Sequence, residues 1–339
     1  MIRFSRRPLH GDFFKTRNDV YFTVIGNTHP PDKIVSYPRY VPHPDGDRKL
    51  GSQSYLRLQS LKGCQEFLGQ HFSQSLVYDP VFDETLCEIP MSQIVDYLYP
   101  EGKLAEMHKA TFLDAVRKTA RDFCLVVMKS SGISPEQIGI SGSILCGLHT
   151  EASDIDIILY GVAPCRRVHS RLQKLLDSSA SDFRRHKTRE MRRLYELRSR
   201  DTTYPSLKGF CSAERRKSCQ GFFREREFFV RFIKPNPREK YSGRRYENLG
   251  KVGLTASVIE DEESIFTPCK YGVAKCESRS RLGHFVKEVT SFRGRFCEQA
   301  VTADRIQVQG KLEKVEGYGE HYLRVIVGNE LEDCMIRLK

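Results

Sequence analysis

Apolar residues recur with a period of two in some stretches of the chain and at helical spacing in others, and this difference predicts four regions. Residues 1–60 have the short, turn-bounded apolar runs of β-strands. Residues 61–132 have apolar positions three and four residues apart, which is typical of amphipathic helices. The strands predicted in the first region are residues 20–26, 34–42 and 52–58. The helices predicted in the second are residues 61–72, a helix capped by Ser92 that reaches residue 98, and residues 103–130, ended by Gly132.

The other two regions are a mixed core, residues 133–235, and a β-rich C-terminal part, residues 236–339, which begins at the proline-rich linker 235–238. In the core, apolar strands are expected at 138–141, 154–160 and 228–233, with a short helix from Ser143 and another from about Arg166. Short, regularly spaced strands in the last region are typical of a small barrel or sandwich, and we expect an OB-like barrel. The fold class is therefore α+β, a mixed sheet flanked by helices between a β/helical N-terminal part and a C-terminal barrel. The C-terminal strands are expected at 251–260, 270–277, 305–315, 321–328 and 333–338.

Residues 138–161 carry the clearest chemical pattern. Gly142 and Ser143 follow the first core strand, and Asp154 and Asp156 stand two positions apart on the second. Side chains alternate between the two faces of a strand, so both carboxylates point the same way. Two adjacent carboxylates repel each other unless a cation lies between them. Mg²⁺ (or Mn²⁺) takes oxygen ligands of this kind together with substrate phosphates.

Gly142 and Ser143 supply the complement to this acidic pair. Glycine lets a phosphate approach the backbone closely, and the start of a helix offers unpaired N–H groups to an anion. The alternative is that Asp154 and Asp156 are solvated residues on an edge strand. That alternative fits poorly, because the apolar residues around them are typical of a central strand. A phosphate cradle that faces two carboxylates suits phosphoryl or nucleotidyl transfer.

Gly-Ser, about ten residues, and then Asp-x-Asp on an apolar strand resembles the signature of the DNA polymerase beta-like nucleotidyltransferase superfamily, whose fuller form occurs in tRNA CCA-adding enzymes. Cys146 and Leu148 depart from the fuller form, which has arginine and threonine there. The resemblance covers residues 125–233, and the whole chain also resembles a set of uncharacterised archaeal nucleotidyltransferase-domain proteins. The positions that match are Gly142, Ser143, Gly147, Ser153, Asp154, Ile155 and Asp156.

The resemblance implies a polymerase beta-like core and a Mg²⁺-dependent (or Mn²⁺-dependent) transfer of NMP from an NTP to a hydroxyl of a nucleic acid or another acceptor. Asp154 and Asp156 would be catalytic and would hold the metal. Gly142, Ser143 and Ser153 would bind the nucleotide.

The superfamily places a third carboxylate on a later strand. Alternation puts Glu227, Phe229 and Arg231 on one face of that strand, so Glu227 is the candidate for the third catalytic acid. Arg231 stands nearer to the position where the family's aspartate aligns. An arginine does not bind a metal but holds a phosphate well, so we expect Arg231 to bind the nucleotide. This departure puts polymer elongation in question more than nucleotide binding.

The net charge of +12 favours polyanionic partners. Residues 184–200 hold eight Lys or Arg against two Glu, which favours a phosphate-contacting helix over a solvated, ion-paired face. Arg293 and Arg295 stand between Phe292 and Phe296, a pattern that suits single-stranded nucleic acid as well as it suits an ordinary surface. The expected partners are therefore an NTP and a nucleic acid, either tRNA or another RNA or DNA.

Other features of the sequence bear on location. No apolar run reaches 18 residues, so no membrane partner is expected, and the basic N-terminus lacks the apolar core of a secretory signal. Eleven scattered cysteines read as ordinary thiols in a reducing cytoplasm.

Two alternatives remain. One is a non-catalytic nucleotide- or RNA-binding protein on a degenerate nucleotidyltransferase scaffold, which Cys146, Leu148 and the uncertain third acid favour. The other is a toxin- or antitoxin-like enzyme that modifies a protein or a tRNA end.

Overall fold

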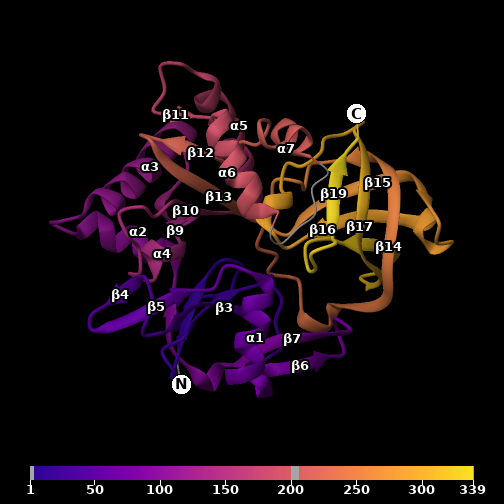
Figure 1. The fold of residues 1–339 in the computed structure, drawn as a ribbon, viewed down its shortest axis with the longest axis horizontal. Helices are drawn as coiled ribbons and strands as arrows, with labels where there is room; N and C mark the ends of the chain where they lie inside the picture. Colours follow the sequence, from indigo (N-terminus) through magenta and orange to yellow (C-terminus); the bar gives the residue numbers. More distant parts are fainter. Residues whose placement is uncertain (1–3, 200–205, 339) are drawn as a thin grey trace. The chain divides into compact units, whose positions relative to one another are not determined.

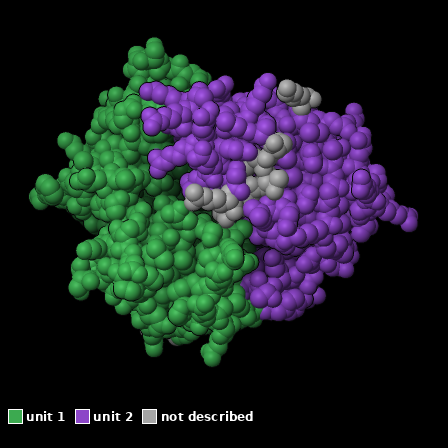
Figure 2. Space-filling view, in the orientation of Figure 1, with its two compact units in different colours: residues 1–77, 87–185, 218–236 green, residues 78–86, 186–217, 237–339 purple. Residues whose placement is uncertain are grey.

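The computed structural model describes residues 4–199 and 206–338, which form two compact units of mixed α and β structure (Figures 1 and 2). Unit 1 comprises residues 1–77, 87–185 and 218–236, and unit 2 comprises residues 78–86, 186–217 and 237–339. The α+β class is confirmed. Unit 1 contains the N-terminal β-rich region together with residues 133–185 and 218–235 of the expected core, whereas residues 186–217 belong to unit 2.

The N-terminal sheet has eight strands in the order β4-β5-β3-β2-β1-β8, with β7 pairing with both β3 and β6. Helix α1 (Leu61–His71) contributes Leu68 to the same apolar core as Phe14 and Phe22. The strands are β1 (Phe13–Thr16), β2 (Tyr21–Val24), β3 (Lys33–Pro42), β4 (Arg48–Leu50), β5 (Gln53–Arg57), β6 (Leu76–Asp79), β7 (Glu84–Pro90) and β8 (Ile94–Leu98).

Two helix predictions are wrong in this part of the chain. The helix expected after Ser92 is strand β8, which pairs antiparallel with β1 and buries Ile94 and Tyr97. Its β-branched and aromatic residues fit a pleated surface, and tertiary pairing overrides the helical spacing. The helix expected at 103–130 is two helices, α2 (Pro100–Lys109) and α3 (Ala115–Ser131), because Asp114 accepts a hydrogen bond from the backbone N–H of Arg117 and starts a new helix.

The core sheet of unit 1 has five strands in the order β11-β12-β13-β10-β9 (Figure 1). Strand β10 lies between β13, to which it is parallel, and β9, to which it is antiparallel. It is therefore a central strand, as its apolar residues predict. The elements are β9 (Ile138–Ile140), α4 (Gly142–Leu145), β10 (Ile155–Tyr160), α5 (Val162–Asp177), β11 (Phe183–Arg184), β12 (Gln220–Phe223) and β13 (Arg226–Ile233).

Unit 2 is built on a six-stranded sheet in the order β14-β15-β16-β18-β17-β19, and β14 also pairs with β17, which closes a ring. Strands β16 and β18 are parallel. The predicted C-terminal strands are confirmed, and β16 was missed. The elements are α6 (Thr188–Arg198), α7 (Leu207–Glu214), β14 (Arg244–Glu260), β15 (Cys269–Ser278), β16 (Val286–Ser291), β17 (Arg305–Gly317), β18 (Glu320–Ile326) and β19 (Cys334–Arg337).

All eleven cysteines are free thiols, and only Cys211 is more than slightly exposed. Across residues 4–199 and 206–338, no helix combines the length and the apolar character needed to cross a bilayer.

Candidate functional site

Strand β10 presents the acidic pair. Asp154 immediately precedes the strand and Asp156 is its second residue, and both are partly exposed, while Ile155 and Ile157 are buried. This burial pattern follows the predicted alternation. The backbone carbonyl of Asp156 accepts a hydrogen bond of 2.8 Å from the N–H of Ser141, which fixes the acidic pair to the loop that precedes α4.

Gly142 lies directly against the Asp156 carboxylate. Its φ is +60°, a left-handed conformation that favours glycine, and a Cβ at this position would lie 2.0 Å from Oδ2 of Asp156. Both the backbone conformation and the close approach therefore require glycine. Gly142 and Ser143 open α4, which is four residues long, and Ser143 is only 3% exposed. Gly142 is buried as well, so both residues of the predicted cradle are enclosed by the chain in this structure.

The two carboxylates lack direct polar partners. In the part of the chain that the structure describes, neither Asp154 nor Asp156 takes part in a side-chain hydrogen bond or an ion pair. Burial and the neighbouring Asp154 raise the pKa of Asp156 to about 6, against the opposing effect of nearby arginines. Ionising both carboxylates therefore costs free energy in the absence of a cation.

A hard divalent cation fits this donor set. Two carboxylates supply part of an octahedral oxygen shell, and Mg²⁺ commonly takes the remainder from water and substrate phosphates. Within residues 4–199 and 206–338, no group of three or more His, Cys, Asp or Glu side chains has the arrangement needed to hold a metal.

The proposed third acid lies on β13. Phe228 pairs with Ile155 and Phe229 pairs with Asp156 across the parallel strands, so an aromatic ring occupies the position beside Asp156. Glu227 precedes Phe228 and pairs on its other side with Phe222 of β12. The structure does not bring Glu227 into a three-residue metal group, and its catalytic role stays a prediction.

Arg231 lies on the same side of the sheet as the acidic pair, as alternation predicts. Its charge lowers the pKa of Asp156, and its register partner on β10 is Ile158. The guanidinium Nη1 of Arg231 lies 2.9 Å from Nε2 of His10. Burial and the charge of Arg231 lower the pKa of His10 well below its usual value. His10 is therefore neutral and adds no second positive charge behind Arg231.

Ser153 supports the loop that leads to Asp154. Its hydroxyl is buried, accepts a hydrogen bond of 2.9 Å from the N–H of Thr150 and lies 3.4 Å from Nη1 of Arg48. Arg48 also donates to the carbonyl of Leu148 at 2.7 Å. Nucleotide binding by Ser153 stays a prediction. The role of Arg48 was missed, since nothing in the sequence links a residue of the N-terminal sheet to a loop 100 positions later.

The departures from the fuller signature are packing positions. Cys146 and Leu148 are buried in one apolar cluster with Tyr40 of β3 and Tyr55 of β5. The N-terminal sheet thus covers the positions where the fuller signature has arginine and threonine. The rings of Tyr21 and Tyr55 meet at 5.6 Å, so these tyrosines are packing partners within the sheet.

Two further arginines of the N-terminal sheet act on the acidic pair. Arg39 of β3 and Arg57 of β5 both lower the pKa of Asp156 by their charge. The sequence gives no signal for this role, because side-chain alternation on β3 and β5 does not indicate which distant strand they face.

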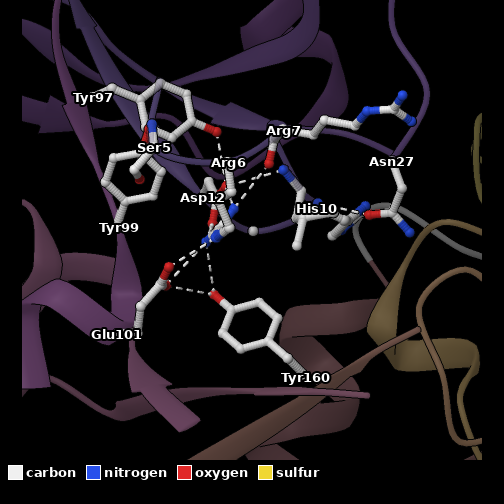
Figure 3. A network of polar contacts seen from close by, with 12 residues as sticks. Ser5, Arg6, Arg7, His10, Asp12, Asn27, Tyr97, Tyr99, Glu101 and Tyr160 are labelled. Atoms are coloured by element: carbon white, nitrogen blue, oxygen red, sulfur yellow. Dashed lines mark hydrogen bonds and ion pairs between the residues drawn. The ribbon is translucent and has the colours of Figure 1, made fainter. Parts of the chain in front are cut away.

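A buried polar network joins the N-terminal segment to the core (Figure 3). Arg6 contacts Asp12 at 2.6 Å, Glu101 of α2 at 2.8 Å and the hydroxyl of Tyr160 on β10 at 3.2 Å. Tyr97 donates to Asp12, which is completely buried, at 2.8 Å. The network fixes β1 and β8 against the end of β10, so the N-terminal sheet and the acidic pair belong to one framework.

The basic segment is partly structural. Arg198 of α6 is buried in an ion pair of 2.6 Å with Glu214 of α7, whereas Arg189, Arg192 and Arg193 are exposed. Arg200 lies outside the described residues.

The Phe292–Phe296 segment also differs from a stacking surface. Phe296 is 1% exposed in the core of the closed ring, and Arg293 donates to the carbonyl of Gly328 at 3.2 Å. Phe296 is therefore a packing residue.

The chain is similar to the uncharacterized protein MJ1086 of Methanocaldococcus jannaschii, with 28% identity over 334 residues, which cover 95% of each chain. No family model matches the chain. No solved structure matches it either.

Proposed function

We propose that this protein is a Mg²⁺-dependent nucleotidyltransferase with a polymerase beta-like core, which transfers NMP from an NTP to a hydroxyl of a nucleic acid or another acceptor. One observation carries the proposal. Two carboxylates without a direct ionic partner among the described residues stand at the start of a central strand, and the carboxylate of Asp156 lies against Gly142, whose positive φ favours glycine. Such a site suits a cation bridged to phosphate.

The architecture supports the finer assignments. A central strand that carries Asp-x-Asp after a Gly-Ser turn is the arrangement expected of the proposed core. In unit 2, the first strand of the ring pairs with the second and the fourth, and the third is parallel to the fifth. This order supports an OB-like barrel, a fold that commonly binds oligonucleotides.

In this proposal each group has a defined task. Asp154 and Asp156 hold Mg²⁺, which when bound neutralises phosphate charge and lowers the pKa of the attacking hydroxyl. Gly142 lets the backbone before α4 approach the Asp156 carboxylate closely, because a Cβ at this position would collide with Oδ2. Arg231 offers guanidinium donors to the phosphates and stabilises the negative charge that develops during transfer.

Two observations favour the non-catalytic alternative. Phe229 occupies the place beside Asp156, and no three-residue metal group is present among the described residues. A nucleotide-binding protein needs only the two acids and the arginines.

Incubation with Mg²⁺ and each labelled NTP tests the proposal, with tRNA, single-stranded DNA or the protein itself as acceptor. Transfer of label by the wild type, its loss in Asp154→Asn and Asp156→Asn, and its retention in the exposed control Asp32→Asn support the enzyme. Transfer that survives in both site variants contradicts the metal role. Nucleotide binding without transfer to any acceptor supports the alternative.

A further inference from the structure

Strands β3 and β5 carry two arginines whose charges act on the acidic pair, and the same two strands pack through Tyr40 and Tyr55 on Cys146 and Leu148 of the loop between Gly142 and Asp154. Arg57 is the register partner of Tyr40, and Arg39 is the next residue back along β3, where its carbonyl accepts from the N–H of Leu58. Nη1 of Arg39 also donates to the carbonyl of Leu58 at 3.1 Å. In residues 4–199 and 206–338, neither arginine forms an ion pair with a carboxylate.

This pair of like charges is unfavourable without a partner. Burial and the charge of Arg57 both lower the pKa of Arg39. Nε of Arg57 is buried and has no hydrogen-bond partner. A buried donor without an acceptor and two neighbouring cations both cost stability, so the arrangement is consistent with a bound group that brings acceptors and negative charge.

The carboxylates of Asp154 and Asp156 do not serve as the acceptors for the two arginines. Asp154 and Asp156 attract Arg57 electrostatically, yet no direct contact joins the acids to the arginines in the described structure. The two sets of charges are held in one framework, because the β3 and β5 tyrosines pack on Cys146 and Leu148 and Arg48 bonds to the loop before Asp154. A group that lies between them must present anionic oxygens to both a carboxylate-bound cation and two guanidiniums.

We propose that Arg39 and Arg57 form a polyphosphate subsite, which holds the β- and γ-phosphates of a nucleoside triphosphate opposite Asp154 and Asp156. The identity of the nucleotide rests on the proposed function, whereas the anion subsite is a property of the two arginines alone. Guanidinium groups match phosphate oxygens with two parallel hydrogen bonds, which a compact ammonium does not. The N-terminal sheet thus supplies the positive charge that is missing at Cys146.

Binding of inorganic triphosphate to the full chain tests the subsite, measured by titration calorimetry in EDTA so that no divalent cation takes part. We expect the wild type to bind and Arg39→Gln and Arg57→Gln each to weaken binding at least about tenfold. Lys49→Gln removes an exposed charge from β4 of the same sheet and should change affinity less than about twofold. Asp154→Asn should bind triphosphate as tightly as the wild type or more tightly, because a repelling charge is gone.

Arg57→Lys separates loss of the subsite from loss of the fold, since it keeps the charge and the stem and should recover part of the affinity. Thermal unfolding of each variant checks that the fold is intact. Unchanged affinity in folded Arg39→Gln and Arg57→Gln overturns the subsite, and so does a wild type that does not bind triphosphate. Displacement of triphosphate by a single-stranded oligonucleotide that lacks a terminal triphosphate, at equal phosphate concentration, overturns the assignment to nucleotide.

The subsite and the proposed function can be refuted independently of each other. Triphosphate binding that depends on both arginines, in a protein that transfers no NMP, supports the subsite and contradicts the enzyme. Normal NMP transfer and normal nucleotide KM in Arg39→Gln and Arg57→Gln contradict the subsite and leave the enzyme standing.

Discussion

Two groups of partly or fully buried charges differ in how their charges are satisfied within the chain. In unit 2, Glu313 bonds to Arg324 at 2.9 Å and to Lys311 at 2.6 Å, and Arg324 covers the ring of Tyr246 at 4.3 Å. In unit 1, the carboxylates of Asp154 and Asp156 have no such contacts among the described residues. The unit 2 charges contact each other within the chain, whereas the two carboxylates beside β10 make no direct contact with an opposite charge among the described residues.

The largest effect that separates the two groups is on activity. Asp154→Asn and Asp156→Asn should each lower Mg²⁺-dependent NMP transfer at least about a thousandfold, because cation binding stabilises the transition state by several kcal/mol. The same variants should unfold at or above the wild-type urea midpoint. A variant that keeps activity, or that loses it only by unfolding, would remove the contrast with unit 2.

The reverse pattern is expected in unit 2. Glu313→Gln removes the carboxylate that Arg324 and Lys311 share, while Arg324 keeps Glu288 and Lys311 keeps Glu84, so the free energy of unfolding should fall by about 1–3 kcal/mol. Nucleotide binding by the folded fraction should be unchanged. Urea unfolding measures the first effect and calorimetry the second. A change in stability below about 0.5 kcal/mol would show that this network is no more structural than a surface pair.

Gly142 has a matched control in Gly51. Both have φ of +60°, but a Cβ at Gly51 meets nothing within 4 Å, whereas one at Gly142 collides with Asp156. Gly51→Ala should cost about 1 kcal/mol for backbone strain alone. Gly142→Ala should cost about 1–2 kcal/mol more and displace the carboxylate, so transfer activity should fall with it. Equal changes in the free energy of unfolding for the two substitutions would show that the Asp156 side chain moves away from the added Cβ at little cost.

A further contrast is the pH dependence of the metal-free protein. Because the folded state raises the pKa of Asp156 from 3.8 to about 6, the folded state binds this proton more tightly than the unfolded state. The contribution of Asp156 to the free energy of unfolding therefore falls by at most about 3 kcal/mol as the pH rises from about 4 to 6, and it stays low above that range.

Asp156→Asn removes this ionisation. In EDTA, its melting temperature relative to wild type should be higher at pH 7.5 than at pH 4. A difference that is the same at both pH values would contradict the shifted ionisation. Asp32→Asn, at an exposed carboxylate, serves as the control.

The sequence predicts what lies on single strands. Alternation along β10 correctly places Ile155 and Ile157 in the core and leaves the acids on the other face. The regular spacing of turn signals identifies most strands of unit 2. These features are local, so a window of a few residues contains them.

The sequence does not predict what lies between distant strands. Local spacing predicts a helix for the segment that forms strand β8. The segment is a strand because it pairs with β1, about 80 positions earlier in the chain, and this pairing outweighs the local spacing. For the same reason Arg39, Arg48 and Arg57 were not recognised as neighbours of a loop and strand that follow about 100 residues later. Cys146 and Leu148 looked like signs of a degenerate site, and the structure shows that they pack under the sheet that carries these arginines.

Binding of Mn²⁺ measured by electron paramagnetic resonance, in the presence of a non-hydrolysable NTP, tests the central claim most directly. The wild type should bind Mn²⁺ in a ternary complex with the nucleotide, and Asp154→Asn and Asp156→Asn should lose that signal while remaining folded. Equal Mn²⁺ binding by the wild type and both variants would contradict the assignment of these two carboxylates as the metal site.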